Sequence, residues 1–414
     1  MREMKDSGVA WIGKIPSNWE IIANKHLMKK IKNIRSKYAG ENVLSLTMRG
    51  VIVRDLDNPT GKMPATFDGY QFVEAGNLLM CLFDIDVTPR CIGLIKNDGV
   101  CSPAYSQFKL SEIADSAYYY YYYLNLDYTK ELLHLAKNLR HSLTEEQLGA
   151  VPTVLPPIAE QYKIVEFLDA KMIQVDTLIA NVQTQVEKLK AYKQSLITEV
   201  VTKGLDPNVL MKDSGVEWIG EIPAHWDVVK TGRLFKENNR KPYGNDSPLS
   251  LSQVDGLIAT DDMKESSLKT STYDNWKRVE LGDLVLNRFK AHLGVLFAAT
   301  LTGIVSFHYG VYEARRTLVP KFYEYLYHAD QYRAILGNAS NGMVVGLQNL
   351  SNLNFYSTYS LYPAYEEQKE IVAYLDRKCS QIDRLISIKQ AKIEKLEQYK
   401  RSLVYEYVTG KKTV

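Results

Sequence analysis

The sequence is poor in cysteine, with four residues in 414, and none of them stands in a Cys-x-x-Cys pair or beside a set of histidines. This argues against a disulfide framework and a zinc site, and it fits the reducing environment of the cytoplasm. Long apolar runs are also lacking, because no stretch approaches the ~18 residues that a membrane span needs. The first residues show no apolar signal-peptide core. We therefore expect a soluble, cytoplasmic chain with no membrane partner.

A strong charge of either sign is the next absence. The chain carries 51 Lys and Arg against 48 Asp and Glu, a formal net charge of +3, so any nucleic-acid surface must be a local patch. The hydrophobic fraction of 45% and the charged fraction of 24% are ordinary for a globular protein and exclude wholesale disorder. At roughly 150 residues per domain, the length predicts two to three domains.

Catalytic motifs are missing as well. The sequence contains no phosphate-binding GxxxxGK[ST] loop, no GxGxxG after a strand, no HExxH and no GxSxG, and its seven histidines are scattered. The Asn/Asp-Pro-Pro-aromatic motif of adenine N6 chemistry is also absent, which disfavours a chain that itself methylates DNA. We therefore predict a non-catalytic protein with no catalytic residue, no metal site and no cofactor bound by this chain.

What the chain does contain is an internal repeat. Residues 4–16 (MKDSGVAWIGKIP) return as residues 211–223 (MKDSGVEWIGEIP), an offset of 207. The same offset aligns residues 156–203 with residues 363–410, with 23 identities in 48 positions. Between these blocks the copies have diverged, as expected for two modules of one fold that bind different ligands. We expect four parts, with limits at 1–154, 155–204, 205–360 and 361–414.

The closing block of each copy has the pattern of a long helix. No proline or glycine occurs between Pro157 and Gly204, and apolar residues recur at alternating spacings of four and three, with Lys193 at the polar position. In the second copy Lys389 and Lys400 interrupt a similar pattern. We predict two long antiparallel coiled-coil helices that separate and join the modules; the alternative is an amphipathic helix packed on its own domain. The predicted seam consists of Leu168, Val175, Ile179, Val182, Val186, Leu189, Leu196, Leu375, Ile382, Ile386, Ile393, Leu396 and Leu403.

The rest of each copy predicts a mixed α/β (α+β) domain. Short β-patterned runs at 42–46, 51–54 and 78–83 alternate with turn residues, and helical stretches follow near 111–137 and 320–336. Tyrosine occupies all six positions from 118 to 123. These rings form either a platform on which bases stack or part of a core, and we expect the core.

Basic residues gather after the opening motif in both copies, and Lys and Arg are the side chains that meet phosphates and read base edges. The alternative for each of them is a solvated surface charge. The candidate DNA contacts are Lys29, Lys30, Lys32, Arg35, Lys37, Arg49 and Arg54 in the first copy, and Arg240, Lys241, Arg288, Lys290, Arg315 and Arg316 in the second.

The doubled opening motif, the closing motif P-x-x-x-E-Q-x-x-I-V-x-x-L-D at 156–169 and 363–376, and the long helices together resemble the DNA-specificity subunit of type I restriction–modification systems. The segment at 99–105 (GVCSPAY) is also similar to target-recognition domains of that family. The resemblance implies two target-recognition domains that each read half of an asymmetric, bipartite site in double-stranded DNA. It identifies no residue that reads bases.

The resemblance also implies partners. Two modification (methyltransferase) subunits would bind the helices, and restriction (motor–nuclease) subunits would complete the enzyme. S-adenosylmethionine, ATP and Mg would be cofactors of those partners. The rival hypothesis is a DNA-independent coiled-coil scaffold whose duplicated domains bind proteins, and retention of a labelled duplex by the assembled complex distinguishes the two.

Overall fold

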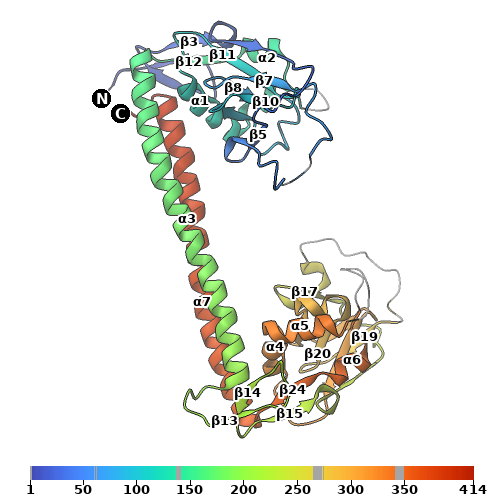
Figure 1. Ribbon diagram of the computed structural model, residues 1–414. Coiled ribbons are helices and arrows are strands. Elements are labelled where there is room, and N and C mark those ends of the chain that lie inside the picture. The colour runs from blue at the N-terminus through green and yellow to red at the C-terminus, as the bar shows by residue number, and fades with distance from the viewer. Residues whose placement is uncertain are drawn as a thin grey trace. The chain divides into compact units, whose positions relative to one another are not determined.

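The computed structural model describes residues 2–59, 61, 63–136, 141–263, 273, 275–340 and 349–414. The chain divides into two compact units (Figure 1). Unit 1 comprises Met1–Val182 together with Ala391–Val414, and unit 2 comprises Gln183–Gln390. The limits of the units fall within the two long helices. Each unit therefore consists of one globular part and one segment of each helix.

Unit 1 contains twelve of the strands and three helices that begin in it. The strands are β1 (Met4–Asp6), β2 (Lys14–Pro16), β3 (Glu20–Ala23), β4 (Met28–Ile31), β5 (Leu44–Thr47), β6 (Gly50–Val53), β7 (Gln71–Val73), β8 (Leu78–Met80), β9 (Ile92–Leu94), β10 (Gly99–Cys101), β11 (Ser106–Leu110) and β12 (Pro152–Leu155). The helices are α1 (Ser116–Thr129), α2 (Glu145–Ala150) and α3 (Ile158–Lys203), with short 3-10 turns η1 (Asn24–His26) and η2 (Glu131–Leu135).

Unit 2 contains a matching series. Its strands are β13 (Met211–Asp213), β14 (Glu221–Pro223), β15 (Asp227–Lys230), β16 (Phe235–Glu237), β17 (Leu249–Ser252), β18 (Gly256–Ala259), β19 (Lys277–Val279), β20 (Leu284–Asn287), β21 (Leu296–Ala298), β22 (Gly303–Val305), β23 (Tyr309–Ala314) and β24 (Tyr359–Tyr362). Its helices are α4 (Pro320–His328), α5 (Asp330–Asn338), α6 (Asn352–Ser357) and α7 (Tyr365–Val408), with 3-10 turns η3 (Thr231–Arg233), η4 (Thr260–Asp262) and η5 (Arg288–Leu293).

The two units have the same sheet topology. The largest sheet has the strand order β4-β11-β8-β9 in unit 1 and β16-β23-β20-β21 in unit 2, and all of its pairs are antiparallel. Two-stranded sheets surround it, namely β1-β2, β12-β3, β5-β6 and β10-β7 in unit 1 and β13-β14, β15-β24, β17-β18 and β19-β22 in unit 2. The middles of the two copies thus keep one topology where their sequences have diverged. Strands β5, β6 and β8 form where the sequence predicts them.

The tyrosine run lies in the core of unit 1. Helix α1 begins after Asp115, whose carboxylate accepts a hydrogen bond from the backbone N–H of Tyr118 at 2.8 Å and so satisfies a free donor of the first turn. Five of the six tyrosines in 118–123 are buried. The Tyr121 hydroxyl donates to Asp169 on α3, which ties the core to the long helix. The interpretation of these rings as core residues is confirmed.

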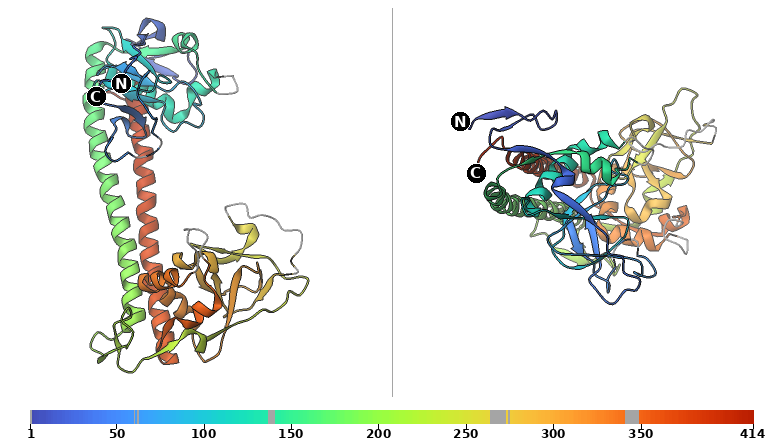
Figure 2. Two further views of the ribbon diagram at one scale, coloured as in Figure 1. Left: turned by 45° about the vertical axis from the view of Figure 1, so that its right-hand side comes forward. Right: turned by 90° about the horizontal axis from the view of Figure 1, so that it is seen from above.

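Helices α3 and α7 have 46 and 44 residues, and segments of the two lie side by side within each unit (Figures 1 and 2). Of the predicted seam residues, Leu189, Ile393 and Leu396 are half-buried and the other ten are buried. In unit 1, Leu168 shares a cluster with Leu403, and in unit 2 Val186 and Leu196 share one with Leu375, Ile382 and Ile386. Those clusters also include the globular cores, so each helix segment packs on both the other helix and its own domain. Among the described residues, no helix is long and apolar enough to cross a membrane.

Polar seam residues pair across the two helices. Lys193 on α3 contacts Asp383 on α7 at 2.6 Å within unit 2, and Lys400 on α7 contacts Asp176 on α3 at 2.5 Å within unit 1. The repeat offset of 207 converts Asp176 into Asp383 and Lys193 into Lys400. The two ion pairs therefore join equivalent positions of the repeat, with the roles of α3 and α7 exchanged. In both units the helix segments run antiparallel, because a residue early in one helix meets a residue late in the other.

The tryptophan three residues after the opening motif of each copy binds the closing motif of the same copy. Trp19 and Trp226 are fully buried, and their indole N–H groups donate to Glu160 at 3.0 Å and to Glu367 at 2.9 Å. Both carboxylates belong to the first turn of a long helix, where the free N–H groups favour negative charge. The two motifs thus fix each globular part to the start of its own long helix.

The glutamine that follows each of these carboxylates is also buried. Its amide oxygen accepts a hydrogen bond from the backbone N–H of the residue before α1 in unit 1 and before α4 in unit 2. Asp115 donates to Gln161 and Val319 donates to Gln368, both at 2.8 Å. The retained Glu-Gln pair of the closing motif is therefore explained by folding. The pair connects the long helix to the tryptophan after the opening motif and to the start of α1 in unit 1 or α4 in unit 2.

Candidate nucleic-acid interface

Two candidate lysines of unit 1 lie on strand β4. Side chains alternate between the faces of a sheet along a strand, so Lys29 and Lys30 point to opposite faces. Lys30 contacts Glu145 of α2 at 3.6 Å, whereas Lys29 lies directly opposite Lys109 of β11. Lys109 is not among the candidates predicted from the sequence. It comes next to Lys29 only because β4 pairs with β11, and no local sequence pattern indicates that pairing.

The other candidates of unit 1 are spread over its loops. Lys32, Lys37 and Arg49 are exposed, and Arg49 lies in the turn between β5 and β6. The Arg35 guanidinium lies 4.6 Å from the centre of the Phe72 ring, which leaves it half-buried.

Arg54 follows β6 and is half-buried, and its backbone N–H donates to Val43 at 2.8 Å. Like Lys32, Arg35, Lys37 and Arg49, it lies outside strand β4. Of the seven candidates of unit 1, Lys29 and Lys30 are the two that belong to a strand of the largest sheet.

Two arginine candidates of unit 2 are neutralised within the unit. The Arg240 guanidinium is surrounded by three carboxylates, at 2.5 Å from Asp283, 3.1 Å from Glu313 and 3.6 Å from Glu280. Arg288 contacts Glu237 at 2.5 Å, and the two side chains are 19% and 15% exposed. Burial alone raises the pKa of Glu237, but the hydrogen bond from Lys277 and the charge of Arg288 outweigh it, so the pKa lies below its usual value.

The remaining candidates of unit 2 are exposed. Lys241 follows Arg240, and Lys290 lies in η5 two residues beyond Arg288. Arg315 donates to the backbone oxygen of Phe235 at 3.3 Å, and Arg316 lies 5.6 Å from the centre of the Tyr362 ring. Of the candidates in unit 2, Lys241, Lys290, Arg315 and Arg316 therefore keep the exposure that a DNA contact requires.

Replacing Arg288 by glutamine is expected to destabilise unit 2. The change removes the ionic hydrogen bond to Glu237, and such bonds contribute about 2 kcal/mol to the free energy of unfolding. The exposed neighbour Lys290→Gln is the matched control and should leave that free energy unchanged within about 0.5 kcal/mol. Urea unfolding measures both variants. An Arg288→Gln protein as stable as the control would contradict a structural role for this arginine.

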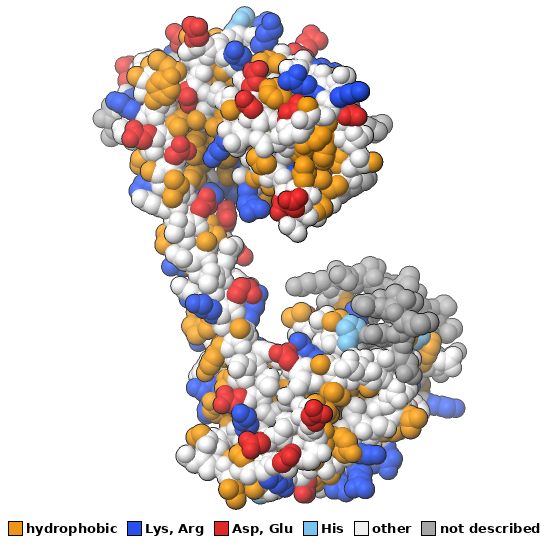
Figure 3. Space-filling view, viewed as in Figure 1, with side chains coloured by type: hydrophobic (Ala, Val, Ile, Leu, Met, Phe, Trp, Pro, Cys, Tyr) orange, Lys and Arg blue, Asp and Glu red, His pale blue; other side chains and the backbone are white. Residues whose placement is uncertain are grey.

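The charges of the described surface are mixed in sign. Figure 3 shows basic and acidic side chains interspersed with apolar ones on the visible face of unit 1. This agrees with the balanced numbers of basic and acidic residues in the whole chain. A phosphate-binding site on this face would therefore consist of a small group of cations rather than of a field that covers the whole face.

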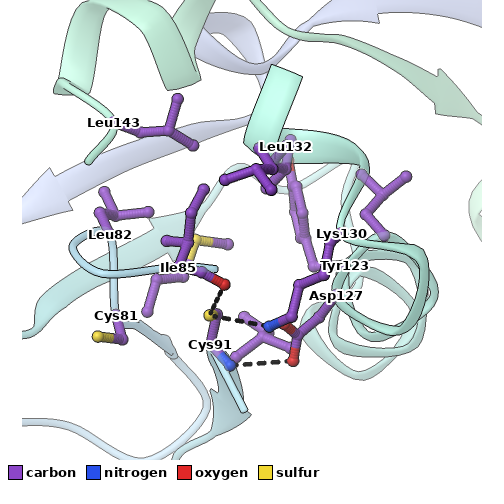
Figure 4. A pocket seen from close by; sticks show the side chains of 13 residues that line it. Cys81, Leu82, Ile85, Cys91, Tyr123, Asp127, Lys130, Leu132 and Leu143 are labelled. Atoms are coloured by element: carbon purple, nitrogen blue, oxygen red, sulfur yellow. Dashed lines mark hydrogen bonds and ion pairs between the residues drawn. The ribbon is translucent and has the colours of Figure 1, made fainter. Parts of the chain in front are cut away.

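A small cavity in unit 1 is lined by Cys81, Leu82, Cys91 and the α1 residue Asp127 (Figure 4). Its volume of about 30 Å³ matches the room for roughly one water and is far below that of a nucleotide site. Lys130 binds Asp127 at 2.8 Å, and Asp127 accepts a hydrogen bond from the backbone of Cys91. Burial raises the pKa of the Cys91 thiol to about 12, so it stays protonated at neutral pH. These contacts hold the segment between β8 and β9 against α1.

In the part of the chain that the structure describes, no group of three or more His, Cys, Asp or Glu side chains is placed to hold a metal ion. All four cysteines are free thiols.

The chain is similar in sequence to curated proteins of one class. No protein-family model matches the chain. It is 27% identical over 278 residues to the type I restriction enzyme MjaVIII specificity subunit of Methanocaldococcus jannaschii. It is 25% identical over 288 residues to the MjaX protein of the same organism. The chain is a homologue of type I restriction enzyme specificity subunits.

These matches cover 62% and 65% of this specificity-subunit homologue and 61% of each relative, so the chain spans about three fifths of the length of the curated relatives it matches. The resemblance predicted from the doubled opening motif and the closing motif is confirmed. Two blocks of 13 and 48 residues, retained at one offset, carry this resemblance.

Solved structures share the fold of the specificity-subunit homologue. A chain from a study of complex assembly and conformational transition of the type I R-M system matches with a TM-score of 0.69 at 13% identity, covering 95% of this chain and 98% of that chain. The crystal structure of the HsdS subunit from Thermoanaerobacter tengcongensis matches with a TM-score of 0.51 at 15% identity, covering 96% and 98%. The mixed α and β architecture with long helices is therefore that of HsdS subunits.

Proposed function

We propose that this chain is the sequence-specific DNA-binding subunit of a type I restriction–modification complex. Its two units are tandem target-recognition modules, and each reads one half of an asymmetric, bipartite site in double-stranded DNA. The helices α3 and α7 form an antiparallel coiled coil that sets the gap between the half-sites. Two modification subunits bind the helices, and restriction subunits complete the enzyme in the cytoplasm.

One observation carries this proposal: the two units share every sheet but differ in the side chains on them. The same strand position holds Lys109 in unit 1 and Glu313 in unit 2. One framework with different surface residues is what two readers of different half-sites require. A duplicated scaffold for one kind of protein would instead keep the same surface in both copies.

The proposed subunit is not itself catalytic. S-adenosylmethionine, ATP and Mg are proposed to bind the partner subunits, in keeping with the motifs that the sequence lacks. The rival hypothesis, a DNA-independent scaffold, predicts that the assembled complex retains no labelled duplex beyond non-specific binding. Mapping the DNA sequence that the assembled complex modifies distinguishes the two hypotheses, because a scaffold that does not bind DNA would not determine that sequence.

Replacing residues 23–154 by the corresponding segment of another specificity subunit is expected to change one half-site and leave the other unchanged. The exchanged segment contains every member of a buried hydrogen-bonded group, so the exchange does not split it. In this group Asn24 accepts hydrogen bonds from Thr153 and Tyr123, both at 2.5 Å. Its ends lie on the paired strands β3 and β12, whose ladder depends on backbone groups. Methylation mapping of cells that carry the intact system measures both half-sites.

The matched control is the equivalent exchange of residues 230–361 in unit 2. That segment carries the corresponding polar group, in which Thr231 bonds Ser360 at 2.8 Å and Tyr327 at 3.3 Å. It should change the other half-site only. A single exchange that altered both half-sites, or neither, would contradict independent reading by the two units.

A further inference from the structure

The strand pair β4-β11 places two lysines in an unfavourable position. Lys29 and Lys109 are direct cross-strand partners, and both are exposed. Side chains at such positions lie about 5 Å apart at their Cβ atoms, and like charges there destabilise the sheet. Neither lysine forms an ion pair with any residue that the structure describes. Unit 1 therefore keeps a repulsive pair that its own fold does not compensate.

The equivalent position in unit 2 shows how the same sheet compensates such a charge. Strand β16 pairs with β23 as β4 pairs with β11, and the cross-strand partners are Lys236 and Glu313. Their side chains form an ion pair at 2.5 Å. The difference between the units is thus one residue, a lysine in one and a glutamate in the other. The geometry of the sheet permits an ion pair, but unit 1 lacks the anion.

The lysine pair borders an open hollow of about 410 Å³. Lys25 and His26 of η1 also line it, and both are exposed. Ser111 lies at its edge, and the Ser111 hydroxyl has no hydrogen-bond partner among the described residues. Three lysines and a histidine therefore border one open space, which suits an anion with several oxygens.

We propose that this hollow binds phosphate groups of the DNA backbone and is a contact that unit 2 lacks at the equivalent position. The inference rests on the proposed DNA-binding function and adds the site and its ligand chemistry. Lysine meets phosphate as a point charge, whereas base edges are read by bidentate Arg, Asn or Gln. The hollow thus positions the duplex on unit 1 and adds affinity without reading sequence.

The test is Lys109→Glu in the full chain, assembled with its modification subunits. This variant rebuilds in unit 1 the ion pair that unit 2 already contains, so its melting temperature should equal or exceed that of the wild type. Binding to a duplex with the recognition site should become less dependent on salt. The slope of log affinity against log salt should fall by about two, because Lys109 is lost and Lys29 is neutralised. A duplex without the site should show the same change.

Lys236→Gln is the matched control, and its slope should equal the wild-type slope, because Glu313 already compensates Lys236. An unchanged slope for Lys109→Glu would overturn the inference, as would a loss confined to the duplex with the site. Inorganic phosphate that raised the melting temperature of the wild type, with no change of slope in the variant, would indicate a site for free anions and would also overturn it. So would a Lys109→Glu chain that no longer bound the modification subunits.

Failure of the proposed function has a different signature. In that case the wild-type complex itself would not distinguish the duplex with the site from the duplex without it, whatever residue stands at position 109. If only the proposal for the hollow were wrong, the wild-type complex would still distinguish the two duplexes. The salt slopes of the wild type, Lys109→Glu and Lys236→Gln would then be equal.

Discussion

If the proposed function holds, a complex whose specificity subunit carries one heptad inserted after Val182 in α3 and another after Gln390 in α7 is expected to modify DNA sites whose halves lie about three base pairs farther apart. Seven helical residues add about 10 Å, and successive base pairs of the duplex are about 3.4 Å apart. Both insertions lie at the limit between the units. The Lys193–Asp383 and Lys400–Asp176 pairs each belong to one unit and therefore stay intact.

The heptad is required because the seam repeats every seven residues. A seven-residue insertion returns the apolar positions to the same face, whereas a two-residue insertion rotates them by about 200°. The two-residue variant should therefore fail to assemble an active complex. An insertion in α3 alone should also fail, since its extra heptad would have no partner in α7. Three base pairs also turn the second half-site by roughly 100° about the duplex axis, so we expect weaker binding along with the longer gap.

Methylation mapping decides this prediction. Both half-site sequences should be unchanged in the paired-heptad variant and only the gap between them longer. An active complex with the original gap would mean that the helices do not set the spacing of the site. The two units would then reach their half-sites by some other means.

Local patterns in the sequence predicted the long helices and the tyrosine core. A stretch without proline or glycine and with a heptad pattern has one stable conformation, and α3 forms between Ile158 and Lys203 as expected. The lysines at polar seam positions could be recognised as exceptions, but their partners could not. Asp176 and Asp383 are unremarkable surface residues until the antiparallel register brings them opposite Lys400 and Lys193.

The candidate site was harder to predict because charge compensation is not local. Arg240 and Arg288 are of the residue type expected of DNA contacts, yet their carboxylate partners Asp283 and Glu237 lie 43 and 51 residues away along the chain. Lys109 has no basic neighbour in its own strand and joins Lys29 only through the β4-β11 pairing. A single sequence gives the positions of charges along the chain, whereas the strand order decides which of them meet.

Truncating Trp226 to alanine is expected to lower the stability of unit 2 by about 3–5 kcal/mol, the usual cost of removing a fully buried large aromatic side chain. The indole joins three elements. It donates to Glu367 at the start of α7, lies near Phe322 of α4, and faces Gly204 just after α3, where an added Cβ would be 3.4 Å from the ring. Losing it should release the globular part of unit 2 from both long helices. Hydrogen exchange should then rise within residues 183–390 and stay unchanged elsewhere.

Trp19→Ala is the matched variant, because Trp19 donates to Glu160 in unit 1 as Trp226 does to Glu367 in unit 2. Its faster exchange should be confined to unit 1. Trp226→Phe keeps most of the ring but removes the N–H donor, and should cost only about 1–3 kcal/mol, mostly for the lost hydrogen bond to a carboxylate. If either alanine variant increased exchange equally in both units, the chain would unfold as one cooperative body. If the units respond separately, each alanine variant should abolish recognition of one half-site, and methylation of the bipartite site should be lost in both.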